Sequence, residues 1–262
     1  MNMKMIFKIM TTTTRTRTAA LALILALAAL AAPPDARADR RAFTHTYEYL
    51  TMPEGGLELE LYNTQKRATF ADASPRAFQL QIEVEYGITD HWDVSLYQVF
   101  DQVSTPDPMT SDPLHYAQTK LRTRYRFAER GELPVDLLAY FELKKDFAAS
   151  VYAIEPKLIV ARDFGPLTAA VNLIAEVEFG DVETEVKPEW TAGVSYEVVP
   201  AFKIGAETIG ALELESKEVA ASAGPALSWA PSPKLWVSAG ALFGLTDGAP
   251  DLTARLIIGL GL

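Results

Sequence analysis

The sequence predicts an all-β fold: one antiparallel, up-and-down transmembrane β-barrel of about twelve strands, preceded by an N-terminal signal peptide. Apolar and polar residues alternate from Phe78 to Phe100, and a period of two places successive side chains on opposite faces of a strand. Similar segments of about ten residues recur along the chain, which is the length that a tilted membrane-crossing strand requires. The N-terminal residues have the features of a secretory signal peptide, which would export the chain from the cytoplasm.

Residues 1–38 have the layout of a secretory signal peptide. Four basic residues precede an apolar run over residues 19–32, and an Ala-Arg-Ala cleavage site ends at Ala38. The run is too short for a membrane-spanning helix, which takes ~20 residues. We expect residues 39–55 to form a periplasmic lead-in and residues 56–262 to form the barrel.

Composition narrows the class of protein. The full chain has a net charge of −10, and removal of the five basic residues and one acidic residue of the signal peptide leaves −14. Nucleic acid is not expected as a partner, because phosphates need a basic surface. The chain has no cysteine, so it forms neither disulfides nor thiolate metal sites. No cofactor is expected.

Twelve alternating segments follow the signal peptide, and ten or fourteen strands are the alternatives. Their connections alternate: the even ones are short or turn-like, and the odd ones are longer or more polar. Short turns on one side and longer loops on the other are typical of outer-membrane barrels, and an even strand number places both termini on the periplasmic side. The segments are residues 56–66, 77–87, 91–103, 115–128, 134–144, 152–162, 166–178, 186–198, 201–213, 218–229, 234–244 and 251–262.

The second and third segments hold the sharpest motif, Glu83-Val-Glu-Tyr-Gly-Ile-Thr-Asp-His-Trp-Asp-Val. The motif predicts a turn in which Gly87 tolerates a positive φ and Asp90 caps the turn by bonding its own backbone. The motif resembles the E-x-E-Y-G-hydrophobic-T-D pattern of a bacterial outer-membrane family named after the phenol meta-degradation pathway. This resemblance implies an outer-membrane barrel that passes small, often hydrophobic or aromatic, molecules.

If the apolar face meets lipid, the polar face lines the lumen. We expect Asp136 near Arg124 or Arg126, and Glu142 near Lys120 or Arg122, with Glu83 and Glu85 two strands or ~10 Å away. Two interpretations remain open: a selectivity lining for polar or anionic solutes, or a salt-bridged filling of a narrow barrel. The candidate lumen-lining residues are Glu83, Glu85, Asp93, Lys120, Arg122, Arg124, Arg126, Asp136 and Glu142.

From the eighth segment onward the predicted inward face consists mostly of small residues. Small side chains leave space, so an off-centre passage beside the charged half is expected. The last segment ends at Leu262 with alternate apolar residues, which resembles the assembly signal of outer-membrane barrels and implies the barrel-assembly machinery as a partner. The small residues are Thr191, Gly193, Ser195, Gly205, Ser222, Gly224, Ser228, Ser238 and Gly240.

The three histidines do not predict catalysis. His45 precedes the barrel, and His91 lies four residues from Ser95, ~13 Å along a strand, which is too far for a nucleophile and its base. His115 follows Ser111 and Asp112 but lacks a hydrolase motif. We therefore expect no enzyme, and no catalytic, cofactor-binding or metal-binding residues.

Together these observations predict a passive channel or facilitator for small molecules, hydrophobic or aromatic ones included, in the outer membrane of a Gram-negative bacterium. Its expected partners are membrane lipid, lipopolysaccharide and the solute. Two alternatives are a closed, salt-bridge-filled barrel with a structural or binding role, and a soluble periplasmic binding barrel. The second stays open because alternation alone does not tell which face points outward.

Overall fold

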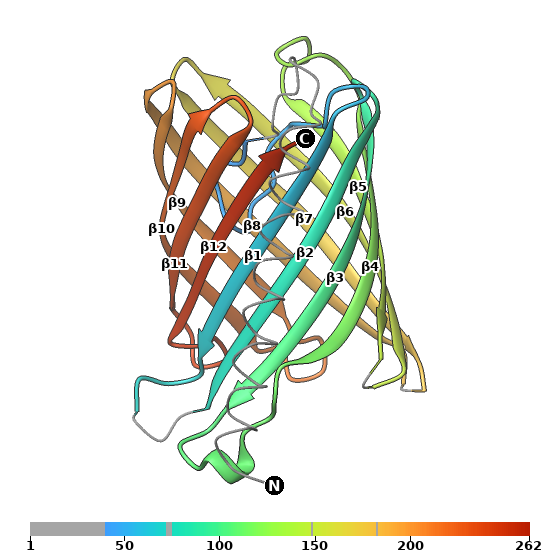
Figure 1. Ribbon diagram of the computed structural model, residues 1–262, viewed down its shortest axis with the longest axis vertical. Helices are drawn as coiled ribbons and strands as arrows, with labels where there is room; N and C mark the ends of the chain where they lie inside the picture. The colour runs from blue at the N-terminus through green and yellow to red at the C-terminus, as the bar shows by residue number, and fades with distance from the viewer. Residues whose placement is uncertain (1–39, 72–74, 148, 182) are drawn as a thin grey trace, which may run out of the picture.

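The structure, a computed structural model, describes residues 40–262 except 72–74, 148 and 182. It is a closed barrel in which each strand pairs antiparallel with its neighbours in sequence (Figure 1). The predicted fold class and strand number are confirmed, and the signal peptide lies outside the described residues. The strands are β1 (Leu57–Arg67), β2 (Arg76–Thr89), β3 (Trp92–Ser104), β4 (His115–Arg126), β5 (Asp136–Asp146), β6 (Val151–Phe164), β7 (Leu167–Gly180), β8 (Glu185–Val199), β9 (Phe202–Leu212), β10 (Val219–Ser232), β11 (Leu235–Gly244) and β12 (Leu252–Gly261).

The barrel closes between its first and last strands. The β1–β12 register runs from Glu58 opposite Gly261 to Arg67 opposite Leu252. The Leu262 N–H also donates a hydrogen bond of 2.8 Å to the Leu57 carbonyl. Closure gives every strand a hydrogen-bonded neighbour on both sides, which removes the edges that an open sheet would expose.

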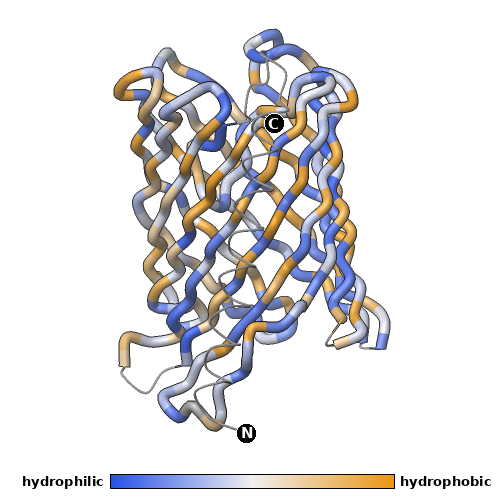
Figure 2. Tube along the Cα trace, viewed as in Figure 1, coloured by the Kyte–Doolittle hydropathy of each residue, from blue (hydrophilic) through white to orange (hydrophobic). Residues whose placement is uncertain are grey.

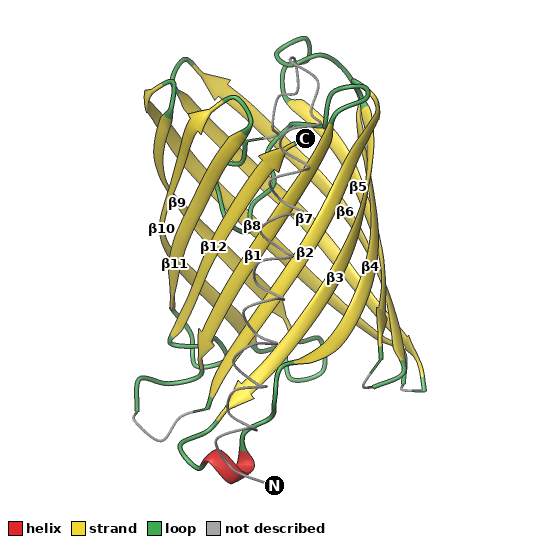
Figure 3. Cartoon of the chain, viewed as in Figure 1, coloured by secondary structure: helices red, strands yellow, loops and turns green. Residues whose placement is uncertain are grey.

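The connections define two different rims. Four of the five turns at one rim span two residues each, at 90–91, 165–166, 200–201 and 233–234. We call this the turn rim, and the chain ends there (upper end of Figure 1). The opposite loop rim carries the longer connections, including a short 3₁₀ helix, Pro108–Thr110 (Figure 3). Across the described residues, no helix has the length and hydropathy to cross a bilayer.

The apolar face of the strands points outward. Hydropathy alternates along each strand (Figure 2), and the exposed positions belong to large apolar side chains from every strand. An uninterrupted apolar exterior exceeds the few hundred Å² that a soluble monomer usually exposes. Examples are Val84, Leu96, Leu121, Phe141, Leu158, Leu173, Val194, Ile204, Leu227, Phe243 and Leu256.

The barrel interior at the turn rim is filled by the chain itself. Residues 40–54, here called the inner loop, enter the lumen and return to the turn rim, where β1 begins (blue in Figure 1). Ala42, Phe43 and Thr44 are fully buried there. The expected lead-in therefore lies within the barrel. Its aromatic and polar side chains pack on the inward faces of the strands instead of facing solvent.

Candidate functional site

Strands β2, β3 and β4 hold a buried ion-pair network inside the turn-rim half. Arg122 is 1% exposed, and its guanidinium lies 2.9 Å from the Glu83 carboxylate and 2.7 Å from that of Glu85. Arg124 pairs with Asp93 at 2.8 Å and also with Glu85. The strands are two apart, as expected, but the long arginine side chains reach across β3. They can do so because β3 presents only the small Ser95 at that level.

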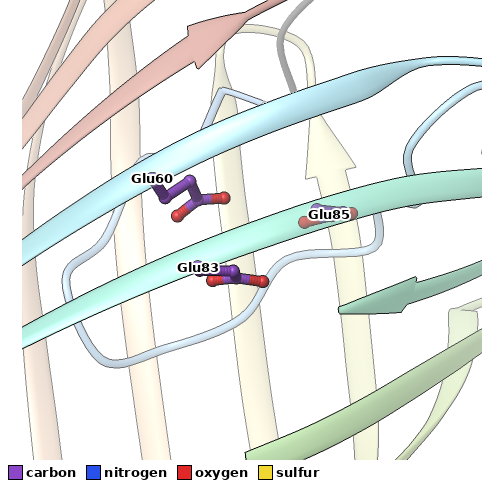
Figure 4. Close-up of side chains that lie close together, drawn as sticks. All are labelled: Glu60, Glu83 and Glu85. Atoms are coloured by element: carbon purple, nitrogen blue, oxygen red, sulfur yellow. The ribbon is translucent and has the colours of Figure 1, made fainter. Parts of the chain in front are cut away.

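Three carboxylates of this region lie close enough to resemble a metal site. Oxygens of Glu60 on β1 and of Glu83 and Glu85 on β2 lie within 4.8 Å of one another (Figure 4). Arg122 contacts two of the three carboxylates directly. The guanidinium thus brings positive charge to Glu83 and Glu85, and these two carboxylates belong to the ion-pair network.

Two other candidates lie at the turn rim. The carboxylate of Asp136 accepts a hydrogen bond of 2.7 Å from the Gly131 N–H, so it caps the β4–β5 connection. Arg126 pairs with Glu129 at 2.9 Å. The arginines that were expected near Asp136 pair with other acids, Arg124 with Asp93 and Arg126 with Glu129. His91 lies 2.6 Å from Glu129, and this contact together with Arg126 lowers the pKa of the exposed Glu129.

The remaining candidates, Lys120 and Glu142, face open space. Their charged groups are 3.7 Å apart, as expected, although the register sets Glu142 opposite Arg122 and Lys120 opposite Lys144. Glu142 also lies 3.7 Å from Lys144, and Lys157 lies 3.0 Å from Glu155. This wall, from β4 to β6, therefore balances its cations with acids.

The inner loop is anchored to β9 by one carboxylate. Glu207 on β9 accepts hydrogen bonds from the backbone N–H groups of Thr44, His45 and Thr46, at 2.9, 2.9 and 3.0 Å. The Thr44 hydroxyl donates to the same carboxylate. A buried acid that satisfies three consecutive N–H groups fixes the backbone there, because each would otherwise lose its hydrogen bonds to water.

Further contacts fix the loop on other sides of the lumen. Asn172 on β7 accepts from the Tyr47 N–H at 2.7 Å and donates to the Tyr47 carbonyl at 2.9 Å. On β12, Arg255 donates to the Thr44 carbonyl at 3.2 Å. The inner loop therefore binds strands all around the barrel and constricts the lumen in the turn-rim half.

The β2–β3 motif that begins at Glu83 binds the end of the inner loop. Gly87 has no positive φ; instead, a Cβ there would lie 2.0 Å from the Pro53 carbonyl oxygen, so the glycine permits a close backbone approach. The Asp90 carboxylate accepts from the Glu54 N–H at 3.0 Å, and Asp93 accepts from the Met52 N–H at 3.1 Å. Both turn predictions are therefore wrong, because the motif receives the end of the inner loop.

Small inward residues of β8 to β11 also accommodate this loop. A Cβ at Gly193 would lie 2.6 Å from the Phe43 ring, and one at Gly240 would lie 2.7 Å from the Thr44 hydroxyl. Ser228 accepts a hydrogen bond of 3.1 Å from Arg40. The space that the sequence assigns to an off-centre passage is occupied by the inner loop at these positions.

Beyond the inner loop, the lumen widens into a cavity of about 390 Å³, here called the vestibule. Its lining includes Lys66, Lys120 and Pro250, which lie toward the loop rim, and Arg41, His45 and Tyr47 of the inner loop. The vestibule has an aromatic component from Tyr62, Tyr97, Tyr140 and Trp190. Of the nine candidate residues, Lys120 and Glu142 contribute to it.

The histidines have partners unrelated to a triad. His45 lies 3.7 Å from Glu207, and His115 Nδ1 lies 3.1 Å from the Pro113 carbonyl. The Ser111 hydroxyl donates within its own loop, to the carbonyl of Thr105 at 3.3 Å. The arrangement thus binds and positions charged groups around a polar cavity.

The chain belongs to the family of unknown function DUF6662, whose model matches residues 35–253. No curated protein matches it. The expected membership of the family named after phenol meta-degradation is not confirmed by these comparisons.

Solved structures share the fold at low sequence identity. The COG4313 outer membrane channel from Pseudomonas putida F1 has a TM-score of 0.66 at 12% identity, over 84% of this chain and 100% of that one. The NanC porin has a TM-score of 0.57 at 12% identity, over 78% and 100%. For the KdgM porin the TM-score is 0.54 at 10% identity, over 78% and 99%. The fold is thus that of porin-like outer-membrane barrels.

Proposed function

We propose that this protein is a passive channel or facilitator for small molecules in the bacterial outer membrane. The vestibule carries the proposal: a polar cavity of about 390 Å³ lies inside a closed barrel whose outer face is apolar. Such a cavity falls within the size range of small-molecule sites. The shared fold with porin-like outer-membrane barrels supports the same function.

The proposed location follows from the surface. Large apolar side chains cover the exterior, which suits lipid and opposes the soluble periplasmic alternative. Membrane lipid and lipopolysaccharide are the proposed neighbours. The last strand, β12, with Leu256 and Ile258 exposed, is proposed to meet the barrel-assembly machinery.

The inner loop sets the permeation limit in this proposal. It occupies the lumen between the vestibule and the turn rim, where Phe43 and Thr44 are fully buried. A solute from the loop rim would reach the vestibule and then pass where the inner loop yields. We therefore expect low or intermittent conductance from the native protein.

The closed barrel is the second candidate function, and the buried network of Arg122 favours it. In that case the lumen serves only to stabilise the barrel, as in narrow barrels filled by their own side chains. This candidate predicts a protein that inserts into membranes and passes no solute.

Planar-bilayer recording with purified, refolded protein tests the proposal. Discrete current steps in potassium chloride are expected, together with membrane partition and heat-modifiable gel mobility. A folded, membrane-inserted protein without current steps at any salt concentration, and without solute efflux from vesicles, would overturn the channel and leave the closed barrel. A protein that stays in the aqueous phase would overturn both.

A further inference from the structure

The two walls of the vestibule differ in how their charges are balanced. Lys120 and Lys157 on one wall lie 3.7 and 3.0 Å from Glu142 and Glu155. On the other side Arg41, Lys66 and Arg255 line the same cavity. Among the described residues, none of these three has a carboxylate partner within 4.0 Å. This side is here called the cationic wall.

Arg41 is held in place and withdrawn from water. It is 6% exposed, its guanidinium lies 4.1 Å from the centre of the Tyr47 ring, and it donates to the Tyr62 hydroxyl at 3.0 Å. Its buried Nε has no hydrogen-bond acceptor within the described structure. A buried cation without a paired anion is costly, so an anion delivered to this side chain would be bound favourably.

Arg255 on β12 is the second cation of the cationic wall, and it contacts both the neighbouring strand β1 and the inner loop. Its Nε donates to the Thr64 hydroxyl at 2.9 Å, and a terminal nitrogen donates to the Thr44 carbonyl, three residues after Arg41. Lys66 lies two residues after Thr64 on the same face of β1, and it is exposed at the mouth of the cavity. The three cations therefore line the vestibule from Lys66 at its mouth to Arg41 on the inner loop.

The acids that act on these cations do not neutralise them directly. Glu60 acts on Arg41, Glu207 acts on Arg255, and Asp101 and Glu189 act on Lys66, each from beyond ion-pair distance. Both oxygens of Glu207 already accept hydrogen bonds from the inner loop. An external anion would thus not have to displace an internal carboxylate.

We propose that the cationic wall is a binding site for a small organic carboxylate. The cavity of about 390 Å³ is larger than an inorganic anion needs, and apolar or aromatic groups such as Ile174, Ile209 and Trp190 share its lining. The carboxylate would lie between Arg41 and Arg255, while Lys66 attracts it at the mouth. As a solute assignment this rests on the proposed channel function, but binding itself requires only access to the vestibule.

Calorimetric titration of the refolded, full-length mature protein tests this site, with benzoate as the probe and benzamide as its uncharged counterpart. Benzoate is expected to bind, and benzamide to bind at least about tenfold more weakly, because benzamide lacks the charge that strengthens hydrogen bonds to Arg41 and Arg255. Arg255→Gln and Lys66→Gln should each weaken benzoate about tenfold or more. Lys187→Gln is the matched control, because Lys187 already pairs with Glu178 at 3.1 Å.

The outcomes separate the site from the channel. Equal affinities for benzoate and benzamide, or benzoate affinity unchanged in both vestibule variants, would overturn the site even if current steps are observed. Specific benzoate binding by a membrane-inserted protein that gives neither current steps nor solute efflux from vesicles would support the site and overturn the channel. Lys66 is exposed, so Lys66→Gln keeps the test valid if Arg255→Gln does not fold. Equal competition by chloride or phosphate would identify a general anion site and reject the organic carboxylate.

Discussion

Arg122 shows how one residue links three strands. It belongs to β4, yet its partners Glu83 and Glu85 are on β2, and its side chain passes over β3. The alternation of polar and apolar residues predicts that all three side chains point into the lumen, because this direction depends only on the phase of each strand. Their direct contact depends on the small Ser95 between them, and alternation does not encode such a clearance.

Arg122→Met should destabilise the barrel. It leaves the buried Glu83 carboxylate without its cation and removes one of the two cations that pair with Glu85, and breaking a buried pair typically costs about 3–5 kcal/mol. The apparent free energy of unfolding, measured with denaturant in detergent micelles, checks this. Arg130→Gln is the control, because its pair with Asp163 is partly exposed and should contribute at most about 1 kcal/mol. Equal effects of the two variants would contradict a special role of the buried network.

Glu207→Gln should loosen the inner loop without breaking the barrel. The amide keeps one acceptor oxygen but loses the charge, and each lost charge-assisted bond costs about 1.5–3 kcal/mol. Since about 1.4 kcal/mol corresponds to a tenfold population change, displaced loop states should become at least tenfold more frequent. Single-channel recordings should then show more frequent or larger openings.

Glu189→Gln is the matched control for this loop variant. Glu189 also lines the vestibule but makes no hydrogen bond or ion pair with the inner loop among the described residues. Identical recordings from Glu207→Gln and the native protein would show that the loop does not limit the current.

At the scale of elements, the strands were predictable and the inner loop was not. Each strand has a period of two, so its range and its inward face follow from the sequence. The inner loop has no such period, and its anchors Asn172 and Glu207 are distant along the chain. Its aromatic residues Phe43, Tyr47 and Tyr49 were the available sign that the segment is buried, since a solvated lead-in would expose these large apolar rings to water.

The β2–β3 hairpin shows the same limit. Its motif is visible in the sequence, but the reason for Gly87 is a backbone contact with Pro53, which belongs to another element. Local sequence alone predicts a turn at Gly87, because glycine is common in turns. Side-chain positions at a loop contact depend on tertiary structure, whereas strand phase does not.

Gly87→Ala should displace the junction between the inner loop and β1. The new methyl would lie 2.0 Å from the Pro53 carbonyl oxygen and 2.6 Å from that of Met52, and such crowding typically costs about 1–3 kcal/mol. Hydrogen exchange of residues 50–56 should accelerate. In the control Gly248→Ala the methyl would meet its nearest atom at 3.6 Å, so a change within about 0.5 kcal/mol is expected. Unaltered exchange in Gly87→Ala would refute the close approach.

At the scale of the whole molecule, the face that points outward decides between membrane and water. Leu173 lies near the middle of β7 and is 54% exposed. In a bilayer, Leu173→Arg should cost about 2–4 kcal/mol of folding free energy, whereas Leu245→Arg in a loop should cost at most about 1 kcal/mol. Folding into lipid vesicles measures both variants. A harmless Leu173→Arg would indicate that this face meets water.

The contacts of the inner loop also constrain the order of assembly. Thr44 binds partners 163 and 211 residues further along the chain, and Tyr47 binds one 125 residues away. Contacts of such long sequence separation form slowly, because large chain loops must close first. The inner loop thus reaches its final place only after the last strands arrive. We expect the inner loop to become protected late in folding, together with the pairing of β1 and β12.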